Sequence, residues 1–260
     1  MALVAVAADK GSPGVTTTAL TLAAVWPRRA LLAELDPSGG DVVLRLRGPQ
    51  QSLLSAERGL ISLAVAARRE LTTELLWQHV QVLDGGLEVL IGVATPEQAG
   101  GLGTLWRPLT TLLAGMPGVD VIADCGRLFP GSPALTVLQG SALVVLVTRP
   151  DVDAVAHLRS RVLSLTQQLG SGGFDGVPVG VVVVADAKDA EVHREVEAVL
   201  ARAGAPAHVL GHLADDKAAA AMLRGQWGGR LRRSLLVRSA REVSGALAAA
   251  LETGELVGAR

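Results

Sequence analysis

Short apolar runs alternate along the chain with longer amphipathic or alanine-rich stretches. The apolar runs are rich in Val, Leu and Ile and have the length of buried β-strands. They lie at 3–7, 30–35, 87–91, 119–123, 143–147, 179–184 and 207–210. The longer stretches predict helices at 16–26, 60–69, 97–113, 152–169, 189–203 and 215–224, and a last helix at 240–251.

This order of elements predicts an α/β fold, with a doubly wound, mostly parallel central sheet and helices on both faces. The chain has 260 residues, of which 49% are hydrophobic, and these suffice to bury one such sheet. We therefore expect a single domain that spans residues 1–260. The segment 170–176 is rich in Gly and Ser and is expected to be a surface loop of that domain.

A Gly-rich segment, DKGSPGVTTT at residues 9–18, joins the first predicted strand to the first predicted helix. Such a loop binds phosphate because unpaired amide groups at the helix start point at the anion. In an alignment on G-x-x-x-x-G-K-[ST], Gly14 is the second glycine and Thr16 is the hydroxyl residue that ligates Mg²⁺. Val15 stands where the phosphate-binding Lys is expected. The alternative is that Gly11 and Gly14 serve only a tight turn.

Two acidic residues follow other predicted strands. Asp36 comes after the run 30–35, and Asp124 comes after the run 119–123. Ligands of such sheets bind at the carboxyl ends of the strands, so we expect Lys10, Asp36 and Asp124 to meet in one site. An apolar strand that ends in Asp is also common in parallel α/β proteins, which leaves a structural role for Asp124 open.

The loop, the two acids and the late strands together resemble the MinD/ParA family of deviant Walker A ATPases. The family pattern K-G-G-x-G-K-[ST]-[ST] corresponds to residues 10–17, and ALLAELDPSGG at 30–40 is similar to its second strand and switch I. The segment 119–126 resembles Walker B and switch II. The similarity runs over nearly the whole chain and implies a P-loop NTPase fold.

The resemblance implies a site for ATP and Mg²⁺. In the family the first lysine, here Lys10, reaches the partner's phosphates across a nucleotide-sandwich homodimer, and the residue matching Asp36 helps to organise Mg²⁺ and the attacking water. The implied catalytic residues are thus Lys10 and Asp36, and the implied metal residues are Thr16, Asp36 and Asp124. The implied nucleotide-binding residues are Lys10, Gly11, Ser12, Gly14, Val15, Thr16, Thr17 and Asp215, the last of which lies where the family usually holds adenine.

The chain departs from the family pattern in three places, and these leave ATP hydrolysis an open question. Val15 replaces the second lysine, Ser12-Pro13 replaces Gly-x, and Glu34 replaces the first Asp of switch I. Pro13 removes one amide that could face phosphate and stiffens the loop. Such changes are typical of a site whose ATP binding or hydrolysis has weakened.

Three functions remain open. The first is a nucleotide-dependent switch that positions or recruits a cellular structure as a homodimer, with weak or lost hydrolysis. The second is a non-hydrolysing pseudo-ATPase scaffold or localisation factor, similar to TadZ/CpaE-like pilus-positioning proteins, which binds a protein partner. The third is a nucleoid-binding partition ATPase. The chain has no tyrosine, which excludes a kinase that phosphorylates its own tyrosines.

Composition limits these functions. The net charge of −1 gives no overall attraction to DNA or anionic lipid, so such binding needs a local patch. A candidate basic patch lies in a stretch of eighteen residues that contains no acid. It comprises Arg224, Arg230, Arg232, Arg233, Arg238 and Arg241, and serves either DNA or an acidic partner, or is a solvated flank of the last helix.

The remaining features favour a cytoplasmic protein. The single cysteine, Cys125, cannot form an intramolecular disulfide and is expected to be a small core residue. The first apolar run has no basic region before it and breaks at Asp9, which is unlike a secretion signal. The longest uncharged stretch, 128–148, contains Pro and Gly, so no transmembrane segment is expected.

Overall fold

The computed structural model describes residues 1–11, 13–169, 176–189, 191–226 and 231–253. Ser12, Arg230 and nearly all of the predicted loop 170–176 lie outside the described residues.

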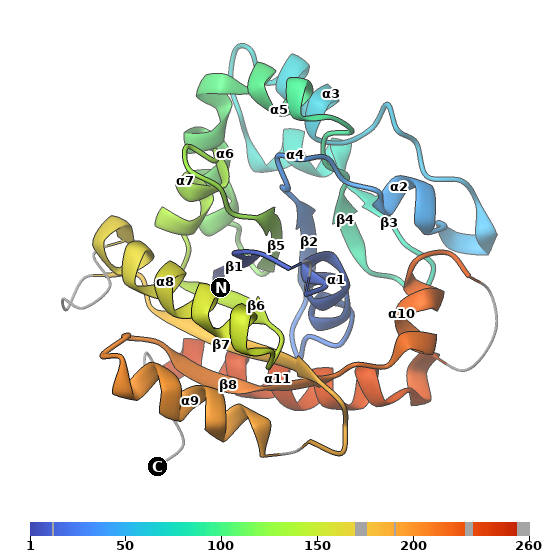
Figure 1. Ribbon diagram of the computed structural model, residues 1–260. Helices are drawn as coiled ribbons and strands as arrows, with labels where there is room; N and C mark the ends of the chain where they lie inside the picture. Colours follow the sequence, from blue (N-terminus) through green and yellow to red (C-terminus); the bar gives the residue numbers. More distant parts are fainter. Residues whose placement is uncertain (12, 170–175, 190, 227–230, 254–260) are drawn as a thin grey trace.

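The fold is built on one eight-stranded sheet within the described residues, in the order β3-β4-β2-β5-β1-β6-β7-β8 (Figure 1). All neighbouring pairs are parallel except β3 and β4. This confirms the predicted α/β class with its mostly parallel sheet. The strands are β1 (Leu3–Ala8), β2 (Ala30–Glu34), β3 (Gln81–Val82), β4 (Glu88–Leu90), β5 (Asp120–Arg127), β6 (Leu143–Thr148), β7 (Val179–Ala185) and β8 (His208–Ala214).

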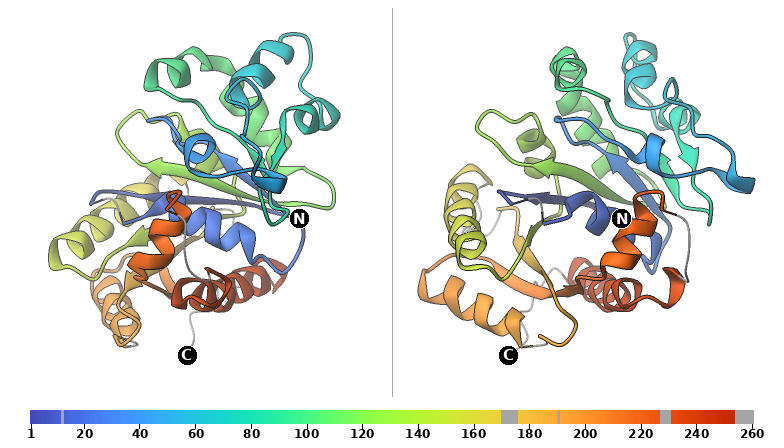
Figure 2. Two further views of the ribbon diagram at one scale, coloured as in Figure 1. Left: turned by 90° about the vertical axis from the view of Figure 1, so that its right-hand side faces the viewer. Right: turned by 45° about the vertical axis from the view of Figure 1, so that its right-hand side comes forward.

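Helices cover both faces of the sheet (Figures 1 and 2). The helices are α1 (Val15–Ala24), α2 (Val42–Arg45), α3 (Leu60–Ala66), α4 (Thr73–His79), α5 (Pro96–Gly101), α6 (Trp106–Ala114), α7 (Ala134–Gln139), α8 (Val152–Leu169), α9 (Val192–Arg202), α10 (Lys217–Leu223) and α11 (Leu235–Thr253). Short 3-10 turns lie at Pro49–Gln51, Gly103–Leu105 and Leu231–Arg233.

The core consists of two layers, one on each face of the sheet. Successive residues of β1 alternate between them: Leu3 belongs to the layer under α3 to α9, and Val4 belongs to the layer under α1, α10 and α11. A central strand that is buried on both faces must be apolar at every position, which is why the strands read as continuous apolar runs.

Several predicted boundaries were wrong. The predicted helix 97–113 is two helices, α5 and α6, because Gly103 has a positive φ and begins the 3-10 turn between them. The last helix begins at Leu235 instead of 240, since Leu236, Ala240, Val243 and Leu247 form one buried stripe. The last strand extends to Ala214, and the short elements α2, α4, α7 and β3 were not predicted.

At the amino end of the sheet, a buried carboxylate ties three elements together. Asp120, at the start of β5, is 1% exposed. It accepts hydrogen bonds from the amide of Ala2 at 2.8 Å, from Trp26 Nε1 at 2.8 Å and from Arg28 Nε at 2.6 Å. Although burial opposes ionisation, these donors outweigh it and lower the pKa of Asp120.

Replacement of Asp120 by Ala should therefore destabilise the fold by about 2–4 kcal/mol, because Trp26 and Arg28 lose their common acceptor. The free energy of unfolding in urea measures this effect. The matched control is Glu88→Gln, which breaks the more exposed ion pair with Arg29 and should cost less than about 1 kcal/mol. Equal losses in the two variants would contradict the anchoring role of Asp120.

Candidate functional site

Helix α1 starts directly after the loop that follows β1. Gly14 closes this loop with φ +94°, in the left-handed region that favours glycine. No side chain of the described residues caps the helix. The amide groups of its first turn are thus left for another acceptor, which is the arrangement that binds an anion at a helix start.

Two arginines hold the start of this loop. The Asp9 carboxylate pairs with Arg161 of α8, and the Asp9 carbonyl accepts a hydrogen bond from Arg127 Nε at 3.1 Å. Sequence reasoning missed both arginines; Arg127 is the last residue of β5, and Arg161 lies on α8 far away in sequence. Lys10, the next residue, is exposed.

Asp124 is a deeply buried acid near the loop, with 1% of its surface exposed. It accepts hydrogen bonds from the Thr16 hydroxyl and from the amide of Gly126, the latter at 3.1 Å. Burial, with a smaller contribution from the charges of Asp36 and Glu34, raises the pKa of Asp124 to about 7 despite these donors. A buried carboxyl with a raised pKa is a site at which a bound cation would restore the charged form.

Asp36 lies against the same turn. A side chain added at Gly126 would come within 2.0 Å of the Asp36 carboxyl group, so this carboxyl group packs against the backbone of Gly126. The amide of the same glycine donates to Asp124. The carboxylate accepts the amide of Ser38 at 2.8 Å, and burial raises its pKa. The structure thus brings together Thr16, Asp36 and Asp124, three of the residues predicted to form the site.

Glu34 has a structural role in this arrangement. Its buried carboxylate accepts the amide of Val42 at 3.1 Å and the amide of Gly92 at 2.9 Å. A side chain at Gly40 would collide with the carboxyl group, which explains the glycine there. Glu34 therefore stabilises the segment 36–42 that carries Asp36. The sequence comparison, in which Glu34 stands where the family pattern has Asp, did not predict this role.

Val15 turns away from solvent. It is 8% exposed and belongs to the core layer that contains Val4 and Val6 of β1 and Leu20 of α1. The position where the P-loop pattern expects a lysine is therefore an integral part of the core. The Val15 side chain itself offers no charge to a phosphate.

A cavity of about 490 Å³ adjoins the start of α1. Its lining includes Gly14 and Thr17 from the loop and helix, and Asp215, Lys217 and Arg224 from the segment after β8. Asp215 accepts a hydrogen bond from Arg149 at 2.9 Å, and this contact lowers the pKa of Asp215. Asp216, in turn, caps α10 through the amide of Ala219 at 3.0 Å.

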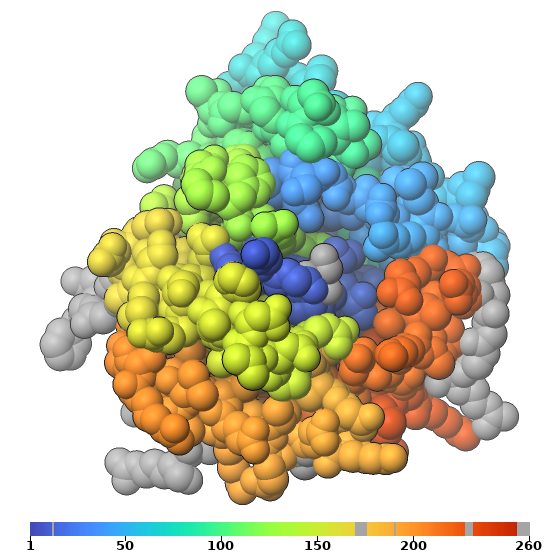
Figure 3. All heavy atoms as spheres, viewed as in Figure 1, coloured from blue at the N-terminus to red at the C-terminus, as the bar shows by residue number. Residues whose placement is uncertain are grey.

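The cavity thus brings Asp215 to the loop, as the sequence prediction required. Arg149, which follows β6 and also lines the cavity, was not predicted as a site residue. Figure 3 shows the surroundings of the loop: the dark blue atoms after β1 lie at the centre of this face, among light blue atoms of the segment after β2, yellow atoms of α8 and orange atoms of α10.

The residues present fit a magnesium ion better than a transition metal. Thr16, Asp36 and Asp124 offer oxygen ligands, which Mg²⁺ prefers, and the ion usually keeps several waters or phosphate oxygens as further ligands. No group of three or more His, Cys, Asp and Glu side chains suited to a metal exists in the described part of the chain. The metal and nucleotide roles of these residues remain predictions.

The other sequence predictions fall outside this site. Cys125 is fully buried in the core. Of the predicted arginine patch, Arg224 lines the cavity beside α1, whereas Arg232 and Arg241 line a second cavity described below. No described helix combines the length and the hydropathy that a membrane crossing needs.

Solved structures with the same fold include ATPases and a diamide synthase. The ParA family ATPase of Chlorobium tepidum TLS is 18% identical, with a TM-score of 0.68 over 95% of this chain and 97% of that chain. The MinD protein of Pyrococcus horikoshii OT3, complexed with Mg-ADP, is 15% identical, with a TM-score of 0.68 over 98% and 99%. The cobyrinic acid a,c-diamide synthase of Mycobacterium smegmatis, with bound ADP and magnesium, is 20% identical, with a TM-score of 0.62 over 97% and 96%.

No model of a protein family matches the sequence, and no curated protein matches it. At these identities the likeness shows the fold: the chain has the α/β architecture of the MinD and ParA ATPases.

The raised pKa of Asp124 predicts a pH dependence of stability in the absence of metal. A carboxyl group whose pKa is higher in the folded than in the unfolded state contributes stability below about pH 3.8, and this contribution is lost as the pH rises through about 7. Asp124→Asn removes that loss, so the variant should lose less stability than the wild type between about pH 5 and about pH 8.

Urea unfolding in EDTA at both pH values measures the difference. Asp153→Asn, at an exposed position of α8, is the control and should behave as the wild type. If the slopes of wild type and Asp124→Asn coincide, the carboxyl group of Asp124 does not titrate as the structure implies.

Proposed function

We propose that this protein is a cytoplasmic, MinD/ParA-like nucleotide switch with a degenerate catalytic site. In this proposal it binds ATP and Mg²⁺ weakly, forms a nucleotide-sandwich homodimer and recruits a protein partner, with slow or no hydrolysis. One observation carries the proposal: Thr16, Asp36 and Asp124 gather beside the uncapped start of α1, while Val15, at the position of the phosphate-binding lysine, is packed into the core.

The weakness of binding follows from the missing charge. A lysine beside the phosphates supplies a charge-assisted hydrogen bond that contributes on the order of 1.5–3 kcal/mol. Its loss lowers ATP affinity by about tenfold or more. In the proposal, Thr16 and Asp124 hold Mg²⁺, Asp36 orients the attacking water, and the amides that follow Gly14 hold the phosphates. Asp215 contacts the adenine base of the nucleotide.

A second candidate is a scaffold of the TadZ/CpaE-like kind, which keeps the fold and the dimer face but does not use ATP. The burial of Val15 favours this candidate, because a side chain packed in the core makes no contact with a nucleotide. The two candidates differ in whether the oligomeric state responds to ATP, and the experiments below separate them.

The first test restores the lysine. Val15→Lys should raise the affinity for mant-ATP in the presence of Mg²⁺ by about tenfold or more, because the aliphatic stem can cover the core while the ammonium group reaches the loop. Val15→Met has a similar stem without charge and serves as the control. An unchanged affinity in a folded Val15→Lys variant would mean that the loop no longer binds nucleotide. Phosphate release measured in the same samples reports turnover.

The second test concerns the exposed Lys10. If Lys10 contacts the partner's nucleotide, Lys10→Ala should leave the monomer folded and abolish ATP-induced dimerisation. Analytical ultracentrifugation with and without ATP and Mg²⁺ detects the dimer, and Lys188→Ala, at another exposed lysine, is the matched control. A wild-type sedimentation coefficient that never responds to ATP would contradict the switch and favour the scaffold.

A further inference from the structure

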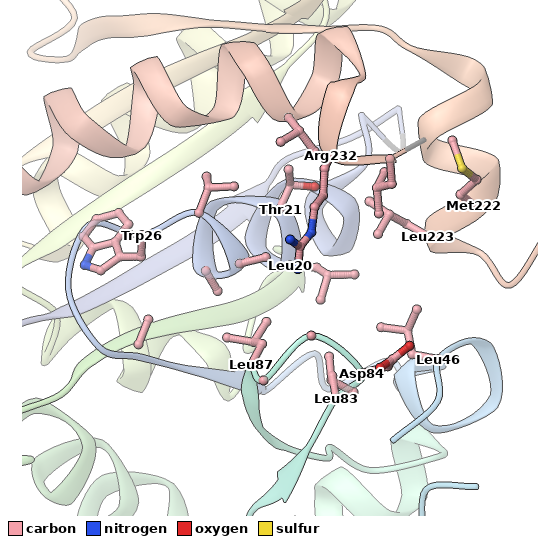
Figure 4. Close-up of a pocket in the computed structure, with 18 of the residues that line it drawn as sticks. Leu20, Thr21, Trp26, Leu46, Leu83, Asp84, Leu87, Met222, Leu223 and Arg232 are labelled. Atoms are coloured by element: carbon pink, nitrogen blue, oxygen red, sulfur yellow. The ribbon is translucent and has the colours of Figure 1, made fainter. Parts of the chain in front are cut away.

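A second and larger cavity, of about 850 Å³, lies beside the other end of α1. Figure 4 shows it between α1 and α11 on one side and the turn that joins β3 to β4 on the other. Its walls come from the carboxyl-terminal half of α1, the start of β2, the end of α2, the β3–β4 turn, the end of α10 and the start of α11. It is separate from the loop after β1 and shares none of the predicted nucleotide and metal residues.

The lining is mainly apolar. Several side chains that pack against the core layer under α1 and α11 remain partly exposed and face this space; they are Val25, Leu46, Leu87, Met222, Leu223 and Leu231. A concave space of a few hundred to about 1,000 Å³, mostly apolar and with a few polar groups, is typical of a site for a small molecule. Burial of such surface would favour an apolar ligand body.

The charged groups of the lining are unevenly paired. Arg28 pairs with Asp120 and Glu252, Arg29 pairs with Glu88, and Arg45 pairs with Asp41.

Three arginines of the lining have no ion pair with any described residue; they are Arg47, Arg232 and Arg241. The lining also contains the acid Asp84, whose carboxylate accepts a hydrogen bond from Gln51 at 2.6 Å. Arg47 donates to the carbonyl of Leu46 at 3.2 Å. The Arg232 side chain extends into the cavity beside Thr21 of α1 (Figure 4). The cavity therefore combines apolar walls with an excess of positive charge.

We propose that this cavity binds a small amphipathic anion, with an alkyl or similarly apolar body and one carboxylate or phosphate head. The body lies on the apolar side chains of α1, α10 and the β3–β4 turn, and the head pairs with Arg232 and Arg241. A duplex nucleic acid fits less well, because its backbone offers charge without an apolar body. The site is independent of the proposed nucleotide switch.

Dodecanoate is the probe, used below its micelle concentration and followed by isothermal titration calorimetry. It should bind the wild type. Dodecyl phosphate should bind with a similar affinity if the arginines recognise mainly the negative charge of the head group. Dodecylammonium has the same body with the opposite charge, and butyrate has the same head with a short body. Each should bind at least about tenfold more weakly than dodecanoate.

The variants test the two halves of the site separately. Arg232→Gln combined with Arg241→Gln should weaken dodecanoate binding by about tenfold or more. Arg233→Gln combined with Arg238→Gln removes two exposed arginines that do not line the cavity, and it should leave the affinity unchanged. Ala24→Phe places a ring in the cavity from an exposed position of α1 and should also weaken binding about tenfold.

Circular dichroism establishes that each variant is folded. The proposal is overturned if dodecanoate does not bind the wild type, if dodecylammonium binds equally well, or if the Arg232 and Arg241 substitutions affect binding no more than those at Arg233 and Arg238.

Discussion

The parallel alignment of three central strands is the constraint on which the rest of the molecule depends. In the register of the sheet, Val6 of β1 and Glu34 of β2 both lie beside Asp124 of β5. Because the strands are buried on both faces, they are mainly apolar, and the acids Glu34 and Asp124 lie in their carboxyl-terminal halves. The loop before α1, Asp36 and Asp124 are therefore neighbours although they are distant in sequence.

That concentration of acids has an electrostatic cost. Glu34, Asp36 and Asp124 are all largely withdrawn from water, and burial raises the pKa of each. Glu34 is compensated by two backbone amides and holds its own loop in place. Asp36 and Asp124 also accept hydrogen bonds, but with Val15 in the core no lysine at that position of the loop balances their charges. A divalent cation between them would relieve this imbalance, which links metal binding to the stability of the sheet edge.

Helix α1 and helix α10 connect this edge to the larger cavity. The first residues of α1 lie at the loop, and its last residues line the larger cavity. In α10, Lys217 and Ala220 line the smaller cavity, whereas Met222 and Leu223 line the larger one. Occupants of the two cavities would thus contact the same two helices from different sides.

The sequence by itself determined the layers of the fold and the order of its main elements, because strands buried on both faces must be apolar throughout and stand out from amphipathic helices. It also predicted that the loop, Asp36 and Asp124 lie close together, since residues near the carboxyl ends of neighbouring parallel strands share one edge of the sheet. Short elements such as α2 and β3 escaped, because a few residues carry no periodic pattern.

Only the tertiary structure decided the roles that depend on contacts between distant residues. In the structure Val15 lies in the core, and Asp9 pairs with Arg161. The Glu34 carboxylate accepts hydrogen bonds from the amides of Val42 and Gly92. The structure also places Arg224 of the predicted arginine patch at one cavity and Arg232 and Arg241 at the other, because the surroundings of a side chain are set by segments far away in sequence.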